Sequence, residues 1–79
     1  MALYEEVVDL ARTYMGPAAK KFIDRQIRVH LEIEGSDLTY SDIEELADWC
    51  YTSSKILMND FKAREFSNAI KSIRNGSRA

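Results

Sequence analysis

The chain has 79 residues, 46% of them hydrophobic and 30% charged, with a formal net charge of −2 and a pI near 5.3. This composition is typical of one folded globular domain, and it argues against a disordered chain or a dedicated nucleic-acid binder. No apolar run approaches the length of a bilayer span, and acids occupy the region where a signal peptide carries basic residues. We therefore expect a cytoplasmic protein without a membrane partner.

Cysteine and charge usage bear on how so small a domain is stabilised. Cys50 is the only cysteine, so no disulfide can form within the chain, and the fold must rely on packing or on a second copy of itself. Residues 31–49 contain seven acids and no lysine or arginine, whereas 17–30 and 50–79 have net charges of +3 and +4. Such alternation favours neighbouring helices that complement one another, and an external charged partner is the alternative.

Apolar residues at helical spacing predict a first helix over 3–15, with an inner face made of Leu3, Val7, Leu10, Ala11 and Tyr14. Gly16 suits the end of this helix and Pro17 suits the first turn of the next. The second helix is predicted over 17–33, burying Ala19, Phe22, Ile23, Ile27 and either His30 or Leu31. On its outer surface Asp24 is spaced to pair with both Lys20 and Arg28.

The third helix, predicted over 39–58, has the clearest start. Thr39 and Asp42 have capping-box spacing, and Leu38 and Ile43 have that of a hydrophobic staple. The buried stripe of this helix is predicted to hold Ile43, Leu46, Ala47, Cys50 and Leu57. A wider apolar surface, to which Trp49, Tyr51 and Ile56 contribute, favours a central position for this helix.

Asn59 is a good cap for a fourth helix, which we predict over 60–74 with the apolar set Phe61, Ala63, Phe66, Ala69, Ile70 and Ile73. No alternating run of β-branched residues predicts a strand. The expected fold class is therefore all-α, in the form of a compact four-helix domain. This single domain is predicted to cover residues 1–76, and the tail at 77–79 is expected to fray.

The residue types that carry catalysis do not form a recognisable set. His30 is the only histidine, and one histidine with one cysteine cannot supply a zinc site. Cys50 lies on a core stripe, and the hydroxyls of Ser53 and Ser54 have no base beside them in the pattern. We therefore predict no catalytic residue, no metal site and no cofactor.

A segment around the first helix break follows a recognisable order: Tyr14, Met15, Gly16-Pro17, small residues, and then an apolar pair and Arg25. It resembles the opening of small helical accessory domains of prokaryotic signalling proteins, such as response-regulator and kinase-associated chains. The resemblance covers about a dozen residues. It implies an interaction module without catalytic residues, which acts in signalling by contact.

Two functions follow from these patterns. The first is a non-enzymatic protein-interaction or regulatory module that binds a protein partner, including a second copy of itself. Its candidate interface is aromatic, and aromatic residues are enriched in binding hot spots: Tyr4, Tyr40, Trp49, Tyr51 and Phe61. The alternative is a nucleic-acid-binding regulator that uses the second and fourth helices, although the acidic pI argues against it. Its candidate basic patch is Lys20, Lys21, Arg25 and Arg28.

Overall fold

The computed structural model describes residues 2–73, and these residues form helices and turns without a strand, which confirms the all-α fold class. The α-helices are α1 (Leu3–Met15), α2 (Ala19–Gln26), α3 (Ile43–Ser54) and α4 (Asp60–Lys71). Short helical turns at Gly16–Ala18, Ile27–Leu31, Gly35–Asp37 and Tyr40–Asp42 connect them. The predicted tail at 77–79 and the last predicted residue of the fourth helix, Arg74, lie outside the described residues.

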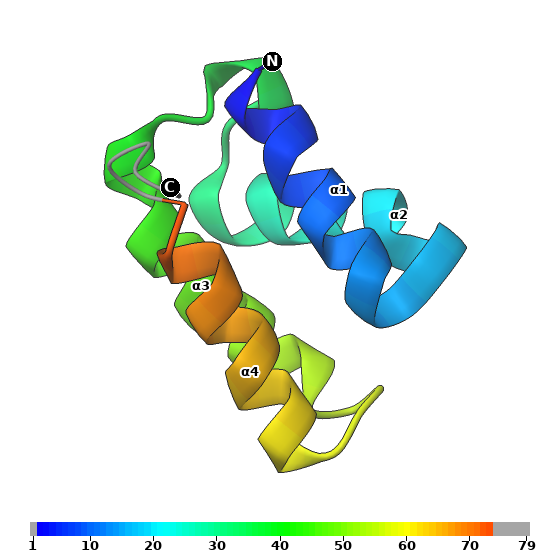
Figure 1. Cartoon of the computed structure of the whole chain (residues 1–79). Coiled ribbons are helices and arrows are strands. Elements are labelled where there is room, and N and C mark those ends of the chain that lie inside the picture. The colour runs from blue at the N-terminus through cyan, green and yellow to red at the C-terminus, as the bar shows by residue number, and fades with distance from the viewer. Residues whose placement is uncertain (1, 74–79) are drawn as a thin grey trace.

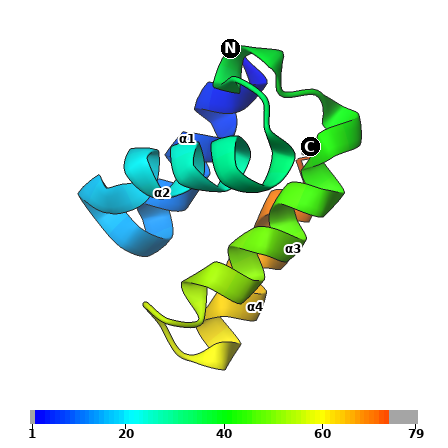
Figure 2. The same cartoon turned by 180° about the vertical axis from the view of Figure 1, so that it is seen from behind.

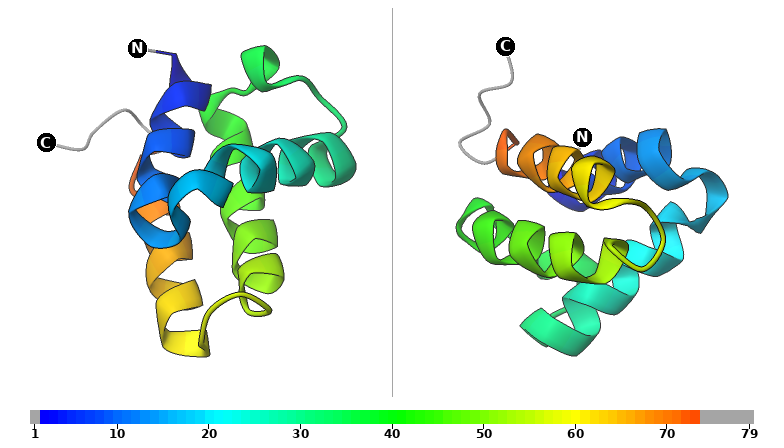
Figure 3. Two further views of the ribbon diagram at one scale, coloured as in Figure 1. Left: turned by 90° about the vertical axis from the view of Figure 1, so that its right-hand side faces the viewer. Right: turned by 90° about the horizontal axis from the view of Figure 1, so that it is seen from below.

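The α-helices are arranged in two layers, and they pack against one another both within and between the layers. α3 and α4 lie side by side and run in opposite directions (Figures 1 and 2). α1 packs against α4 and α2, while α2 packs against α3. Seen from below, α1 and α4 form one layer and α2 and α3 the other (Figure 3). The Cα radius of gyration of 11.2 Å is that of a compact domain of this length.

The core between these layers is centred on Phe66, whose side chain is fully buried. Its ring centroid lies 5.2 Å from that of Tyr14 and 6.1 Å from that of Phe22, so one aromatic residue of α4 joins α1 to α2. α3 and α4 approach closely at two small residues, where the Ser67 hydroxyl donates to the Ala47 carbonyl at 3.0 Å. The prediction that Ile43, Leu46, Ala47 and Cys50 form the buried stripe of α3 is confirmed.

The start of α3 follows the capping signals. The Asp42 carboxylate accepts from the Thr39 backbone N–H at 3.0 Å and from the Thr39 hydroxyl at 2.9 Å. A 3-10 turn over Tyr40–Asp42 leads into the α-helix, and Leu38 is buried beneath it. Because the carboxylate also lies at the positive end of the helix dipole, these contacts fix where the chain turns into the helix.

The end of α3 corrects the sequence prediction. The helix stops at Ser54 rather than at residue 58, and the next N–H groups, of Ile56 and Leu57, donate to carbonyls three residues back, those of Ser53 at 3.4 Å and Ser54 at 2.8 Å. The chain then reverses into α4, where the Asn59 side chain accepts from the Lys62 N–H at 2.8 Å. The prediction that Leu57 belongs to the buried stripe is therefore wrong, since its side chain is 61% exposed.

The second predicted helix also differs from its prediction inside and at its end. After Gln26 the helix widens into a π-helical turn over Ile27–Leu31, and the chain leaves it at Glu32 in the left-handed conformation (φ 59°). Gln26, which no apolar pattern could assign to the core, is 3% exposed. Its side-chain oxygen accepts from the Ser53 hydroxyl at 2.9 Å, and this bond satisfies a polar group at the seam between α2 and α3.

Candidate functional site

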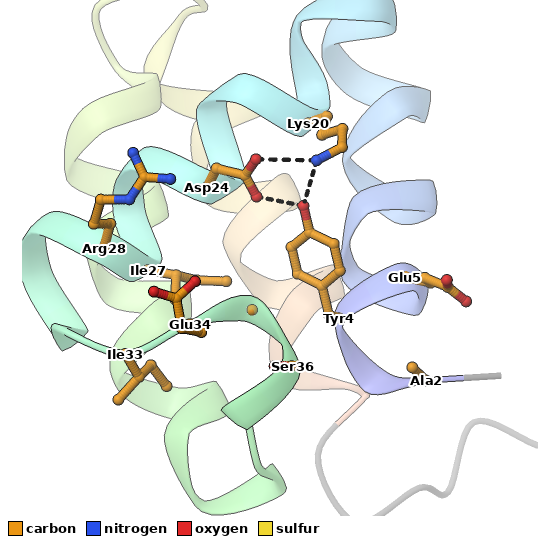
Figure 4. A pocket seen from close by; sticks show the side chains of 11 residues that line it. Ala2, Tyr4, Glu5, Lys20, Asp24, Ile27, Arg28, Ile33, Glu34 and Ser36 are labelled. Carbon is orange, nitrogen blue, oxygen red and sulfur yellow. Dashed lines mark hydrogen bonds and ion pairs between the residues drawn. The ribbon is translucent and has the colours of Figure 1, made fainter.

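A surface pocket lies between the start of α1, the outer side of α2 and the segment that leads towards α3 (Figure 4). The Tyr4 ring forms one wall, and its hydroxyl donates to the Asp24 carboxylate. Lys20 Nζ lies 3.1 Å from the Tyr4 hydroxyl and 3.2 Å from Asp24. On the other side of the ring, a Cβ added to Gly35 would lie 2.7 Å from the ring's Cδ1. These contacts, which we call the Tyr4 clasp (Tyr4, Lys20 and Asp24), hold α1, α2 and the following loop together.

The protonation states within the Tyr4 clasp suit a structural role. Burial and the hydrogen bond to Asp24 raise the pKa of the Tyr4 hydroxyl. Burial would raise the pKa of Asp24 too, but the hydrogen bonds from Tyr4 and Lys20 outweigh it and lower that pKa overall. The hydrogen bond with Tyr4 raises the pKa of Lys20. At neutral pH the phenol is protonated between a carboxylate and an ammonium group, so it is neither a nucleophile nor a general base.

The structure divides the candidate basic patch. Lys20 belongs to the Tyr4 clasp, whereas Lys21, Arg25 and Arg28 are exposed. Their spacing of four and three residues places these three on one face of the second helical segment. The predicted pair of Lys20 with Asp24 forms, while Arg28 acts on Asp24 only through its charge, by lowering the pKa of that carboxyl.

The cations of α4 that the structure describes do not extend this basic face, because each lies beside an acid. Lys62 lies 3.9 Å from Glu65 and Arg64 lies 2.9 Å from Asp60. Lys71 reaches across to α3 and lies 3.4 Å from Asp48. In the described part of the second and fourth helical segments, the cations outside any ion pair are therefore a short strip of Lys21, Arg25 and Arg28, which is less than the two-helix patch that the nucleic-acid alternative requires.

The predicted aromatic interface also separates into two groups. Tyr4 is held in its clasp, and Trp49 is half-buried and stacked on His30, with ring centroids 3.7 Å apart and planes 5° apart. The Tyr51 hydroxyl donates to Asp60 at 2.5 Å, a bond that helps to lower the pKa of Asp60. These three aromatics make contacts within the fold. Tyr40 and Phe61 remain exposed, at 46% and 71%.

Phe61 is accompanied by two exposed apolar residues that the sequence did not assign to an interface. Ile56 and Leu57, in the turn between α3 and α4, are 86% and 61% exposed. We call these three residues the apolar tip (Ile56, Leu57 and Phe61). The tip lies where α3 turns back into α4, at the opposite end of this helix pair from the N-terminus of the chain (Figure 1). The sequence signal that could have found it is the cap at Asn59, which requires the preceding chain to leave the helix.

The remaining candidate nucleophiles are held inside the fold. Cys50 is fully buried, and burial raises the pKa of its thiol, which disfavours the reactive thiolate. Ser53 donates to Gln26, and Ser54 donates to the Tyr51 carbonyl at 3.4 Å. Within residues 2–73 no group of three or more His, Cys, Asp or Glu side chains is arranged to hold a metal ion.

Comparisons with known proteins found no match for this chain. The chain matches no family model, no curated protein and no solved structure. The resemblance of the segment around Gly16-Pro17 to signalling accessory domains therefore stays a prediction. In the part of the chain that the structure describes, the helices are too short or too polar to cross a membrane.

Proposed function

We propose that this chain is a compact four-helix, non-enzymatic protein-interaction module of the cytoplasm, and that it binds its partner through the apolar tip. The observation that carries the proposal is the exposure of Ile56, Leu57 and Phe61 within one six-residue stretch, at 86%, 61% and 71%. Single exposed apolar residues are common on soluble proteins, whereas a contiguous group of large ones marks an interaction site.

The other candidate groups fit the same function. The Tyr4 clasp satisfies its own polar groups, and Cys50, Ser53 and Ser54 are engaged or buried, so none of these groups is poised for covalent or acid–base chemistry. Two residues within the same stretch of chain are anchored to the fold: Met58 packs against the core, and Asn59 caps α4. A preorganised apolar surface loses little entropy when a partner covers it.

Nucleic-acid binding remains a prediction that no particular contact favours. The cations of α4 in the described part of the chain are paired with acids, as the exposed Lys20 is with Asp24, which leaves Lys21, Arg25 and Arg28 of the second helical segment. We rank it below protein binding for this reason.

Site-specific photocrosslinking in cells that naturally make the protein tests the proposal. We expect the variant Phe61→p-benzoylphenylalanine to give a discrete protein adduct, because the tip contacts the partner directly. Excess unmodified protein should compete the adduct away, and Ile56→Ser with Leu57→Ser should abolish it. The matched control carries the same photoreactive residue at Lys21, on the basic face of α2. Equal adducts from both positions, or none from position 61, would contradict the proposal.

A further inference from the structure

A second pocket opens beside the apolar tip. It has a volume of about 370 Å³ and lies between the end of α1 and the start of α4, lined by Thr13, Tyr14, Met58, Lys62 and Glu65. Phe61 borders this pocket without lining it. The residue directly precedes Lys62 and stands four positions before Glu65, so Phe61 and Glu65 lie on the same face of α4. A protruding aromatic side chain and a concave site therefore stand next to each other on one helix.

The pocket is large enough for the ring that stands beside it. It is open to solvent and of mixed character, with polar walls from Thr13, Lys62 and Glu65 and apolar surface from Met58 and Tyr14. The Phe61 ring does not enter its own pocket, since it is 71% exposed. The thioether of Met58 and the ring of Tyr14, both packed against the core, offer a soft apolar floor to an incoming ring.

We propose that the partner of the apolar tip is a second copy of this chain, related by a two-fold axis, with each Phe61 ring seated in the pocket of the other copy. The inference rests on the proposed function and names its partner. A two-fold interface must be self-complementary, and a knob adjacent to a matching hole on the same surface satisfies this condition.

The charges at the pocket rim fit the same arrangement. Lys62 and Glu65 lie 3.9 Å apart within one copy, and their side chains are 58% and 49% exposed. This pair is exposed and at the distance limit of an ion pair, so an incoming partner can exchange its contacts at little cost. When two copies meet about a two-fold axis on this face, Lys62 of each copy faces Glu65 of the other. Opposite charges at a rim set register and orientation more than affinity.

The area of the tip sets the strength of the dimer. One exposed aromatic ring and two aliphatic side chains supply roughly 400 Å² per copy, about half of what a standard stable interface buries. We therefore expect a transient dimer with a dissociation constant on the order of 10–100 µM. Phe61→Ser should raise this constant at least about 10-fold, because aromatic anchors at the centre of an interface dominate binding.

Charge exchange across the interface gives the sharpest test, by sedimentation velocity of the whole chain. Lys62→Glu places acids at both rim positions, and Glu65→Lys places bases at both. Each variant alone should dimerise more weakly than the wild type, since like charges then face each other. An equimolar mixture should recover a dimer, because both contacts become opposite in sign. The single Phe61→Ser variant, whose side chain is exposed and whose fold is checked by circular dichroism, should remain monomeric in every mixture.

The outcomes separate this inference from the proposed function. Monomeric wild type at millimolar concentration would overturn the dimer, and so would a mixture that behaves as the sum of its two components. In that case a competed adduct from position 61 with a different protein still supports binding at the tip. Loss of that adduct as well would end both proposals.

Discussion

Phe66→Ala is expected to lower the free energy of unfolding by about 3–5 kcal/mol, the usual range for removing a buried aromatic side chain. Phe66 is fully buried and its ring contacts those of Tyr14 and Phe22, so the substitution leaves a cavity where three helices meet. A chain of 79 residues has a total stability of about 4–12 kcal/mol. The variant should therefore lose much of its folded population at ordinary temperature.

Urea denaturation measures this loss, with Trp49 fluorescence and circular dichroism as two probes at low protein concentration, where association does not add stability. The matched control is Phe61→Ala, the same change five residues away on the same helix. Because Phe61 is 71% exposed, its removal should change the free energy of unfolding by no more than about 0.5 kcal/mol. Similar losses for the two variants would show that Phe66 is not the centre of the core.

Gly16→Ala is expected to cost about 1–3 kcal/mol, through the backbone alone. Gly16 has φ 61° and ψ −137°, a combination that L-residues with a side chain rarely adopt. A Cβ at this position meets no atom within 4 Å, so no side-chain clash contributes. The residue reverses the chain between α1 and α2, and its N–H donates to the Arg12 carbonyl.

A chemically synthesised chain with D-alanine at position 16 isolates the cause. A D-residue favours positive φ, so this chain should be at least as stable as the wild type. Thermal unfolding of the glycine, L-alanine and D-alanine chains compares them directly. If L-alanine and D-alanine destabilise the fold equally, the backbone explanation is wrong.

Local signals predicted the beginnings of the helices well. The first helix occupies its predicted range, and the caps at Thr39 and Asn59 stand where their side-chain chemistry placed them. These features depend on residues within one turn of each other, so a sequence contains them completely. Most of the buried faces followed for the same reason, since helical periodicity selects the side that packs, and the exceptions are Leu57 and Phe61 at the turn between α3 and α4.

The helix ends and the polar part of the core could not be predicted in this way. Ile56 and Leu57 continue the apolar pattern of α3, yet after Ser54 the chain turns away through hydrogen bonds that span three residues instead of four. Gln26 is buried because Ser53, on another helix, supplies its hydrogen bond. Both outcomes depend on contacts between segments far apart or between competing turns, which residue spacing does not encode.

The candidate interface could not be predicted fully from the sequence either, because it too depends on tertiary contacts. The sequence predicts Phe61 both in the apolar set of the fourth helix and as an interface aromatic; the first prediction is wrong, since the side chain is 71% exposed, and the second stays a prediction. Tyr4 and Tyr51 have the composition of interface residues, yet Asp24 and Asp60 engage their hydroxyls. Whether an aromatic side chain faces a partner or its own fold depends on such tertiary contacts.

The central claim is that the apolar tip, rather than the basic strip of α2, is the contact surface. Amide chemical shifts of the ¹⁵N-labelled chain, followed from micromolar to millimolar concentration, test it most directly. We predict that concentration-dependent shifts are confined to residues 13–14 and 55–65, the tip and its neighbouring pocket. Shifts centred instead on Lys21, Arg25 and Arg28, with the tip unchanged, would contradict the claim.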